Sequence, residues 1–211
     1  MKLLFVTATN TNIGKTFATL KLIKHISKHK LSVGVCKPIE TGVLNNTPSD
    51  AKRLLDSCKI YNSNYNIFSP KDITAYTFKL PASPFCADIE QKIEIKTLKS
   101  KIDELSKLCD ILIIEGAGGL MVPIKRDYMI IDLIEELRAK TLLVTPSNLG
   151  CINDTMLSIE ALERRGIDFD WCVNLHRDRD EFMRVTAPFY NSHFNSWWFL
   201  DEGLDRFIEN L

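Results

Sequence analysis

Residues 3–16 read LLFVTATNTNIGKT, and this stretch decides the fold of the chain. It opens with a short apolar run that is typical of a buried β-strand, and an amphipathic helix is predicted to begin at Lys15. Between a strand and a helix, the sequence Gly14-Lys15-Thr16 is typical of a phosphate site, because backbone N–H groups and the positive end of the helix surround the anion. In such a loop Lys15 reaches the β- and γ-phosphates, and the Thr16 hydroxyl binds Mg²⁺.

Strand-like and helix-like segments alternate along the rest of the chain. Apolar runs predict further strands at 32–37, 111–114, 142–144 and 171–173. Apolar residues at helical spacing predict helices at 15–29, 49–57, 94–109, 129–138, 153–165 and 178–187. Ser49 is a candidate N-cap, and residues 60–90 are less regular.

The run 111–114 is apolar throughout, which is typical of a strand that is covered on both faces in the middle of a parallel sheet. Strands that alternate with helices imply a sheet with right-handed crossover connections. We therefore expect a single α/β domain over residues 1–211, with a mostly parallel central sheet and helices on both faces.

Composition excludes several classes of protein. Of the 211 residues, 27 are Lys or Arg and 27 are Asp or Glu, which argues against a nucleic-acid binder that works through a general basic field. A hydrophobic content of 45% is too high for a disordered protein. No run approaches the roughly 18 apolar residues of a membrane span, and the apolar start is too short for a signal peptide. We therefore expect a cytoplasmic protein, without a membrane partner, whose six cysteines are free thiols.

Charged side chains stand where the predicted strands end, which is the edge where open α/β sheets bind ligands. Glu115 follows the most apolar strand, Asp50 opens the helix after the second strand, and both offer oxygen ligands to a hard cation. Lys37 ends the second strand, where a second ammonium group can neutralise charge during phosphoryl transfer. The positions alone leave open a capping role for Glu115, a helix-dipole role for Asp50 and simple exposure for Lys37.

Together these segments resemble the dethiobiotin synthetase family, and the match extends over most of the chain. Residues 8–16 align without a gap with the family loop G-T-D-T-E-V-G-K-T, with Ala8 in place of Gly and Asn10 and Asn12 in place of Asp and Glu. The other shared segments are K-P-x-x-[ST]-G at 37–42, P-x-S-P at 81–84, E-G-A-G-G at 115–119 and L-G-x-I-N at 149–153.

The resemblance implies a P-loop α/β domain that works as a homodimer on 7,8-diaminopelargonate, CO₂ and ATP, with Mg²⁺. One amine captures CO₂ as a carbamate, and a carbamate oxygen attacks the γ-phosphate. The second amine then displaces phosphate from the carbamic-phosphoric anhydride and closes the ring of dethiobiotin. This chemistry needs charge neutralisation and positioning rather than a nucleophilic side chain.

The resemblance also implies roles for individual residues. Lys15, Lys37 and Thr11 would be catalytic, and Thr16, Asp50 and Glu115 would hold Mg²⁺. The nucleotide would contact Asn12, Ile13, Gly14, Lys15, Thr16, Phe17, Asp50, Glu115, Gly116, Ala117, Gly118 and Asn174. The substrate would contact Thr41, Pro81 and Gly118, and across the dimer interface Leu149, Gly150, Cys151 and Asn153.

The C-terminal part departs from the family pattern. Asn174 sits where the family has an adenine-contacting Asn, but residues 195–198 lack the G-x-x-P type of segment that follows. We therefore expect a relaxed base preference, with GTP accepted as well as ATP. A GTP-to-ATP rate ratio far below one, at equal concentration, would contradict this expectation.

Three other functions remain open alternatives. A regulatory ATPase switch of the partition or septum-site type would carry a lysine early in the loop, as in K-G-G-x-G-K-T, and residues 8–13 contain none. A cobyrinate amidotransferase would carry a downstream glutaminase domain, for which this length leaves no room. A catalytically inactive binding protein is disfavoured by the intact Lys15, Thr16, Lys37 and Glu115.

Overall fold

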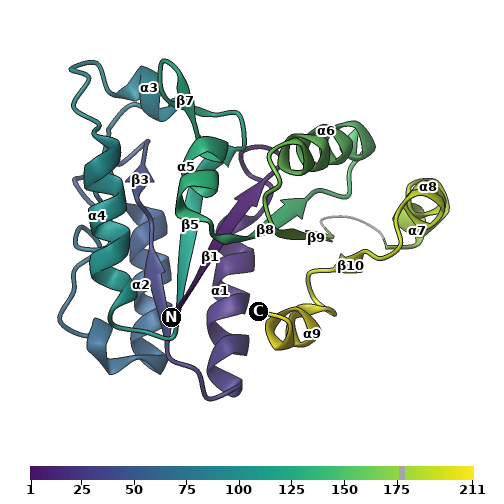
Figure 1. Ribbon diagram of the computed structural model, residues 1–211, viewed down its shortest axis with the longest axis horizontal. Coiled ribbons are helices and arrows are strands. Elements are labelled where there is room, and N and C mark those ends of the chain that lie inside the picture. The colour runs from purple at the N-terminus through teal and green to yellow at the C-terminus, as the bar shows by residue number, and fades with distance from the viewer. Residues whose placement is uncertain (176–178) are drawn as a thin grey trace.

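A six-stranded parallel sheet forms the centre of the protein, in a computed structural model that describes residues 1–175 and 179–211 (Figure 1). The strand order is β10-β9-β8-β1-β5-β2. The strands are β1 (Lys2–Ala8), β2 (Val33–Cys36), β5 (Ile111–Gly119), β8 (Lys140–Thr145), β9 (Phe169–Val173) and β10 (Trp198–Phe199). The predicted fold class, a mostly parallel α/β sheet, is confirmed.

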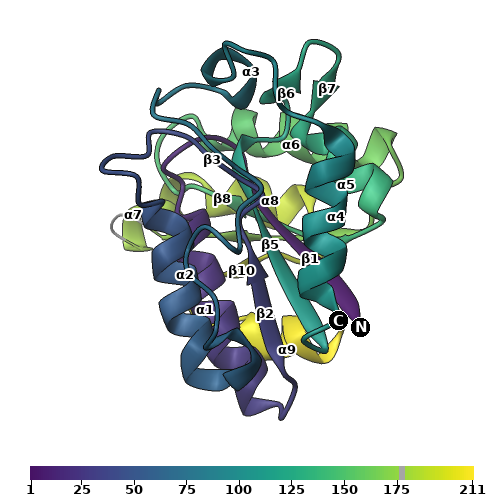
Figure 2. The same ribbon diagram turned by 90° about the vertical axis from the view of Figure 1, so that its left-hand side faces the viewer.

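Helices cover both faces of this sheet. Figure 2 shows α1 and α2 on one side of β1, β2 and β5, and α4 and α5 on the other. The helices are α1 (Lys15–Lys28), α2 (Ser49–Tyr61), α3 (Pro84–Ala87), α4 (Ile95–Ser106), α5 (Ile130–Leu137), α6 (Cys151–Arg164), α7 (Arg179–Val185), α8 (Ala187–His193) and α9 (Leu204–Glu209), with a short 3₁₀ turn η1 (Ser63–Tyr65). No helix of the described residues is long and apolar enough to cross a lipid bilayer.

The apolar strands are buried because helices exclude water from both of their faces. Leu4, Phe5 and Val6 of β1 are inaccessible to solvent, and residues 111–114 of β5 are at most 2% exposed. Burying such side chains contributes about 1.5–3 kcal/mol each, so β1 and β5 contribute strongly to the stability of the domain. Because all the main strands are parallel, the loops that follow β1, β2, β5 and β8 meet at one edge of the sheet.

Two pairs of short strands were not predicted. β3 (Ile39–Glu40) pairs in parallel with β4 (Tyr76–Thr77), and β6 (Pro123–Lys125) pairs antiparallel with β7 (Tyr128–Met129). Each strand has only two or three residues, too few for a hydrophobic period to show. Both pairs lie beyond the carboxyl edge of the main sheet, where they shape the cavity described below (Figure 2).

Several predicted boundaries are corrected. α6 begins at Cys151, two residues before the predicted start at 153, and α2 extends to Tyr61 rather than 57. The helix predicted at 178–187 is instead α7 followed by α8, and residue 178 lies outside the described residues. The prediction of Ser49 as an N-cap is wrong, because Pro48 is the N-cap residue and Ser49 is already helical.

Candidate active site

The loop between β1 and α1 is shaped to receive a phosphate. Asn12 and Gly14 have positive φ angles of 60° and 105°, so the backbone turns sharply before α1 begins. Gly14 is the N-cap residue of α1 and supplies no side-chain cap, which leaves the start of the helix suited to bind an anion. Lys15 lies across the loop, and its Nζ donates to the Asn10 carbonyl oxygen over 3.0 Å.

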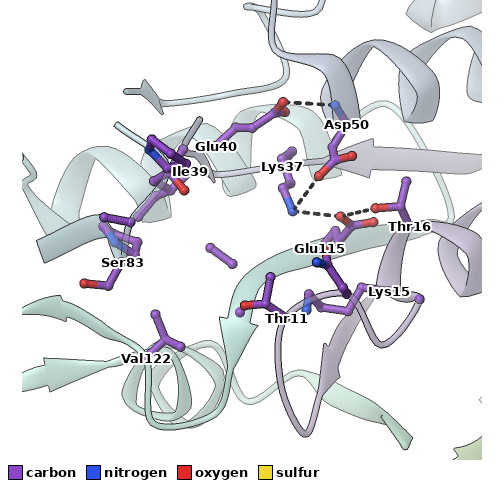
Figure 3. Close-up of a pocket in the computed structure, with 18 of the residues that line it drawn as sticks. Thr11, Lys15, Thr16, Lys37, Ile39, Glu40, Asp50, Ser83, Glu115 and Val122 are labelled. Atoms are coloured by element: carbon purple, nitrogen blue, oxygen red, sulfur yellow. Dashed lines mark hydrogen bonds and ion pairs between the residues drawn. The ribbon is translucent and has the colours of Figure 1, made fainter. Parts of the chain in front are cut away.

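This loop forms one wall of a cavity of about 670 Å³, a volume typical of small-molecule sites. The other walls come from residues that follow β2 and β5, the first turns of α2, and residues 81–84 (Figure 3). The predicted site residues that line it are Thr11, Asn12, Gly14, Lys15, Thr16, Phe17, Lys37, Thr41, Asp50, Pro81, Glu115, Ala117 and Gly118.

Lys37 is at the centre of a buried polar network in this cavity. Its Nζ donates to Glu115 Oε1 over 2.7 Å and to the Gly116 carbonyl oxygen over 3.0 Å (Figure 3). Asp50 Oδ2 lies 3.9 Å from the same Nζ, and Thr16 Oγ1 donates to Glu115 Oε1 over 3.0 Å. Lys37 and Glu115 are only 4% and 1% exposed, so this ion pair is shielded from water.

The ion pair keeps Lys37 charged despite its burial. Burial alone lowers the pKa of a lysine, because the ammonium form loses its hydration. The negative charges of Glu115 and Asp50 outweigh burial, and the pKa of Lys37 is raised above its ordinary value of 10.5. A cation that stays charged at neutral pH can stabilise negative charge that develops beside it.

The residues around Glu115 fit a hard divalent cation. Glu115 Oε2 is buried and has no hydrogen-bond partner among residues 1–175 and 179–211, which is costly unless a cation or another donor binds it. The Thr16 hydroxyl lies beside Glu115 and the Asp50 carboxylate lies beside Lys37, and both supply further oxygen atoms of the kind that Mg²⁺ prefers (Figure 3). No group of three or more His, Cys, Asp and Glu side chains in the described residues could hold a metal ion, so a cation here would need Thr16 and phosphate oxygens as well.

Lys15 differs from Lys37 in its electrostatic surroundings. Its burial and the positive charge of Lys37 lower the pKa of Lys15 from 10.5 to about 8, against the opposing effect of Glu115 and Asp50. The free enzyme therefore loses the Lys15 charge at mildly alkaline pH. A phosphate group bound to Lys15 favours the charged form and raises this pKa again.

Nucleotide affinity should therefore fall above pH 8. If Lys15 binds the phosphates in its charged form, the protein must take up a proton to bind nucleotide at alkaline pH. We therefore expect affinity at pH 9 to be about tenfold weaker than at pH 7. Isothermal titration of ADP over this range measures the effect. Lys15→Arg is the matched control, because guanidinium stays protonated and should give a nearly flat profile. An equal slope in Lys15→Arg would show that another group is responsible.

Leu149, Gly150, Cys151 and Asn153 do not line this cavity. They form the start of α6, where Gly150 is the N-cap residue with a φ angle of 93°. Leu149 is 91% exposed, whereas Cys151 is buried. Helix α6 and the phosphate loop together line a second cavity of about 340 Å³. Its lining residues are Thr9, Asn10, Gly119, Leu120, Met121, Val122, Asp154, Leu157, Ser158 and Ala161.

Asn174 lies directly behind the phosphate loop. Its backbone N–H donates to the Thr145 carbonyl oxygen over 2.8 Å, and its side-chain Nδ2 donates to the Ile13 carbonyl oxygen over 2.8 Å. The residue is almost fully buried. Its side chain therefore ties the end of β9 to the loop that carries Lys15. Trp197 and Trp198 are partly buried and pack against the core.

Sequence reasoning did not assign a site role to seven of the residues that line the larger cavity, namely Ile39, Glu40, Arg53, Ala82, Ser83, Pro84 and Val122. Glu40 stands out because it is an acidic side chain that is only 4% exposed. The signal that could have found it is an acidic residue two positions after a strand-end Lys-Pro pair, where the chain continues beyond the edge of the sheet.

Comparison with known proteins supports the P-loop fold and identifies close relatives. Residues 2–171 match the model of a family described as an AAA domain. The chain is 56% identical over 211 residues to the ATP-dependent dethiobiotin synthetase of Sulfurovum sp. (strain NBC37-1), covering 100% of both chains. It is 35% identical over 214 residues to the enzyme of the same name from Wolinella succinogenes, covering 100% of this chain and 98% of that one.

Solved structures with a similar backbone are more distant in sequence. A plasmid partition protein from Borrelia burgdorferi superposes with a TM-score of 0.62 at 11% identity, covering 100% of this chain and 99% of that one. The MinC:MinD cell division protein complex of Aquifex aeolicus gives a TM-score of 0.57 at 13% identity, covering 100% of this chain and 86% of that one. At such low identity these matches show a shared fold and carry no information about activity.

Proposed function

Because the chain belongs to the family of ATP-dependent dethiobiotin synthetases, we propose that the cavity around Lys37 is where it joins CO₂ to 7,8-diaminopelargonate. The enzyme is an ATP-dependent ligase of biotin biosynthesis. The observation that carries the proposal is the pairing of two lysines with different surroundings in one cavity. Lys37 is fixed by Glu115 and Asp50, while Lys15 closes the phosphate loop.

The reaction consists of three steps that need little covalent help from the protein. One substrate amine adds to CO₂, loses a proton and becomes a carbamate. A carbamate oxygen then attacks the γ-phosphorus of ATP, the bond to the β-phosphate breaks, and ADP leaves. The second amine attacks the carbonyl carbon of the resulting carbamic-phosphoric anhydride, so that phosphate leaves and the ring closes.

The two lysines neutralise charge during phosphoryl transfer. Lys15 would bind the β- and γ-phosphate oxygens from the phosphate loop, where the start of α1 adds partial positive charge. Lys37 directly follows β2, which is separated from β1 by β5 in the sheet, and it faces the same cavity. It would bind the γ-phosphate and the carbamate oxygens. Because Lys37 is held by Glu115 before the substrates bind, little reorganisation is needed when charge develops.

Thr16, Asp50 and Glu115 would hold Mg²⁺ between the protein and the phosphates. When bound, Mg²⁺ neutralises the negative charge of those phosphate oxygens that the two lysines do not contact. Glu115 supports this assignment through its buried and unpaired Oε2. Asp50 supports it through its place in the first turn of α2, where its carboxylate faces the cavity.

The substrate would lie along the remaining walls of the cavity. Thr11 and Thr41 both line the cavity, and their hydroxyl groups would position the amine or the carbamate. Pro81 and Gly118 would form the apolar contacts beside them. Removing water from this space strengthens each electrostatic contact with the reacting groups.

A homodimer would complete the substrate site at the start of α6. Leu149, Leu157 and Met121 are exposed apolar side chains, and the last two border the cavity between α6 and the phosphate loop. A second copy that covers them would bring the N-terminus of α6, with Gly150, Cys151 and Asn153, toward the carboxylate of the substrate. Sedimentation equilibrium measures this association.

A relaxed base preference remains part of the proposal. Asn174 uses its side-chain amide to bind the Ile13 carbonyl oxygen, so this amide group is engaged with the loop. The phosphates and the divalent cation would then provide most of the binding energy, and GTP would serve beside ATP.

A coupled assay tests the proposed function. Incubation with diaminopelargonate, bicarbonate, Mg²⁺ and ATP should yield dethiobiotin and phosphate in equal amounts, and omission of diaminopelargonate should stop phosphate release. The matched control is Asp110→Asn, which alters an exposed carboxylate bound to Ser32 away from the cavity and should leave the yield unchanged. Phosphate release without dethiobiotin, at the same rate with or without diaminopelargonate, would instead indicate a simple ATPase.

A further inference from the structure

Glu40 is a buried carboxylate whose position none of the roles above explains. It lies in β3, whose backbone is fixed by pairing with β4, and its side chain is directed toward the start of α2 rather than toward solvent (Figure 3). Its Oε1 accepts the backbone N–H of Asp50 over 2.9 Å, and its Oε2 accepts the N–H of Ala51 over 2.8 Å. The Ser49 hydroxyl donates to Oε1 over 3.4 Å. Both carboxylate oxygens are therefore engaged with the first turn of one helix.

Helix α2 depends on this distant carboxylate because it lacks a cap of its own. The N-cap residue is Pro48, which has no side-chain acceptor, and the helix shows no side-chain cap from that position. The first N–H groups of a helix need partners, and a carboxylate near them also gains from the helix dipole. Glu40, which lies ten residues before Asp50 in the chain, supplies both the hydrogen-bond acceptors and the negative charge.

This arrangement joins the two sides of the cavity. Glu40 lies between Lys37 and Thr41 on one segment, and it fixes the backbone of Asp50 on another. Asp50 in turn faces Lys37 Nζ at 3.9 Å. A shift of Glu40 would therefore move the Asp50 carboxylate relative to Lys37 and Glu115.

We propose that Glu40 is a positioning residue that holds Asp50 in place for the divalent cation. The inference rests on the proposed function, in which Asp50 is a cation ligand. Glu40 touches neither the cation nor the reacting atoms, and it acts through the backbone of Asp50. Outer groups that orient a metal ligand typically affect metal affinity or activity by about 10–100-fold.

Two substitutions separate the charge of Glu40 from its hydrogen bonds. Glu40→Gln keeps one acceptor oxygen but places an amide NH₂ against a backbone N–H, so one of the two contacts is lost. Glu40→Ala removes both contacts and the charge. We expect Mn²⁺ affinity in the presence of ADP to fall in both variants, by about tenfold or more in Glu40→Ala and by less in Glu40→Gln. Electron paramagnetic resonance of free Mn²⁺ measures this without any turnover.

Turnover provides a second measurement with a different expected pattern. In Glu40→Gln the ligand Asp50 is still present but displaced, so a higher Mg²⁺ concentration should restore most of kcat while KM for diaminopelargonate stays unchanged. Asp88→Asn is the matched control. Asp88 is another buried carboxylate that accepts two successive backbone N–H groups, from Lys92 and Ile93, and it does not line the cavity. The Asp88→Asn substitution should lower the free energy of unfolding without raising the Mg²⁺ concentration that turnover requires.

The outcomes distinguish failure of this inference from failure of the proposed function. Asp50→Asn should weaken Mn²⁺ binding at least as much as Glu40→Ala. If Asp50→Asn weakens binding while a folded Glu40→Gln binds Mn²⁺ as tightly as the unmodified protein, the role of Glu40 is overturned and the metal site stands. If Asp50→Asn has no effect, the ligand assignment itself is wrong. Circular dichroism establishes folding, and Glu40→Gln remains measurable if Glu40→Ala does not fold.

Discussion

Replacing Lys15 by alanine is expected to lower turnover by at least about 10²–10³-fold, the range found when one preorganised donor to developing charge is removed. Lys15 lies in the phosphate loop, where its ammonium group donates to the Asn10 carbonyl oxygen. Under the proposed function it would exchange this partner for the phosphates when nucleotide binds. Alanine leaves these phosphate oxygens without their closest cation. The fold should persist, because Lys15 contributes little to the apolar core and removal of a partly desolvated charge is tolerated.

A rate measurement beside a second lysine variant tests this expectation. Lys21→Ala is the matched control, because Lys21 lies on the same helix, pairs with Asp201 at 2.8 Å and does not line the cavity. It should retain normal turnover. A folded Lys15→Ala protein with normal turnover would remove the phosphate-loop assignment altogether.

Replacing Lys37 by methionine is expected to affect activity and stability together. Methionine has nearly the length of lysine but no charge, so Glu115 remains as an unpaired carboxylate at 1% exposure. Breaking a buried ion pair in this way costs about 3–5 kcal/mol of folding free energy. Turnover should fall by at least about 10²-fold, because the γ-phosphate and carbamate lose a preorganised cation.

The double variant Lys37→Met/Glu115→Gln separates these two effects. Neutralising Glu115 removes the unpaired charge, so the free energy of unfolding, measured in urea, should recover in part. Activity should not recover, because neither the cation nor the metal ligand is restored. If the double variant recovered both turnover and the free energy of unfolding, Lys37 would be shown to act only on stability.

Much of the fold was accessible from the sequence because its signals are local and strong. The apolar runs at 3–7 and 111–114 predict buried parallel strands, and these form the neighbouring inner strands β1 and β5 of the sheet. The Gly-Lys-Thr sequence fixes the start of α1, and the strand ends place Lys37 and Glu115 at one edge. The rule that ligands bind at the carboxyl ends of parallel strands then brings these residues together.

Other features depend on contacts that a linear pattern does not carry. Ser49 had the right residue type and spacing for an N-cap, yet the cap of α2 is supplied by Glu40 through a long-range contact. The strand β10 has two residues and pairs with β9 at the edge of the sheet, so no hydrophobic period marks it. Likewise, the engagement of the Asn174 amide with Ile13 depends on the end of β9 meeting the phosphate loop.

The alternative of a regulatory ATPase switch illustrates the difference between fold and function. The partition and cell division proteins share this backbone arrangement, but at 11% and 13% identity they show the fold alone. The full-length relatives at 56% and 35% identity are dethiobiotin synthetases. Within the site, the second cationic side chain is Lys37, which directly follows β2 and pairs with Glu115 of β5, rather than a lysine in the phosphate loop.

The central claim is that the cavity around Lys37 transfers the γ-phosphate of ATP to a carbamate oxygen. Oxygen-18 in the CO₂ pool tests it most directly, because the oxygen that attacks the γ-phosphorus leaves with the phosphate when the ring closes. With ¹⁸O-labelled bicarbonate in a brief reaction, mass spectrometry should find label in the phosphate in proportion to the dethiobiotin formed. Phosphate without ¹⁸O, whose fourth oxygen comes from water, would contradict the account if dethiobiotin accumulates at the same time.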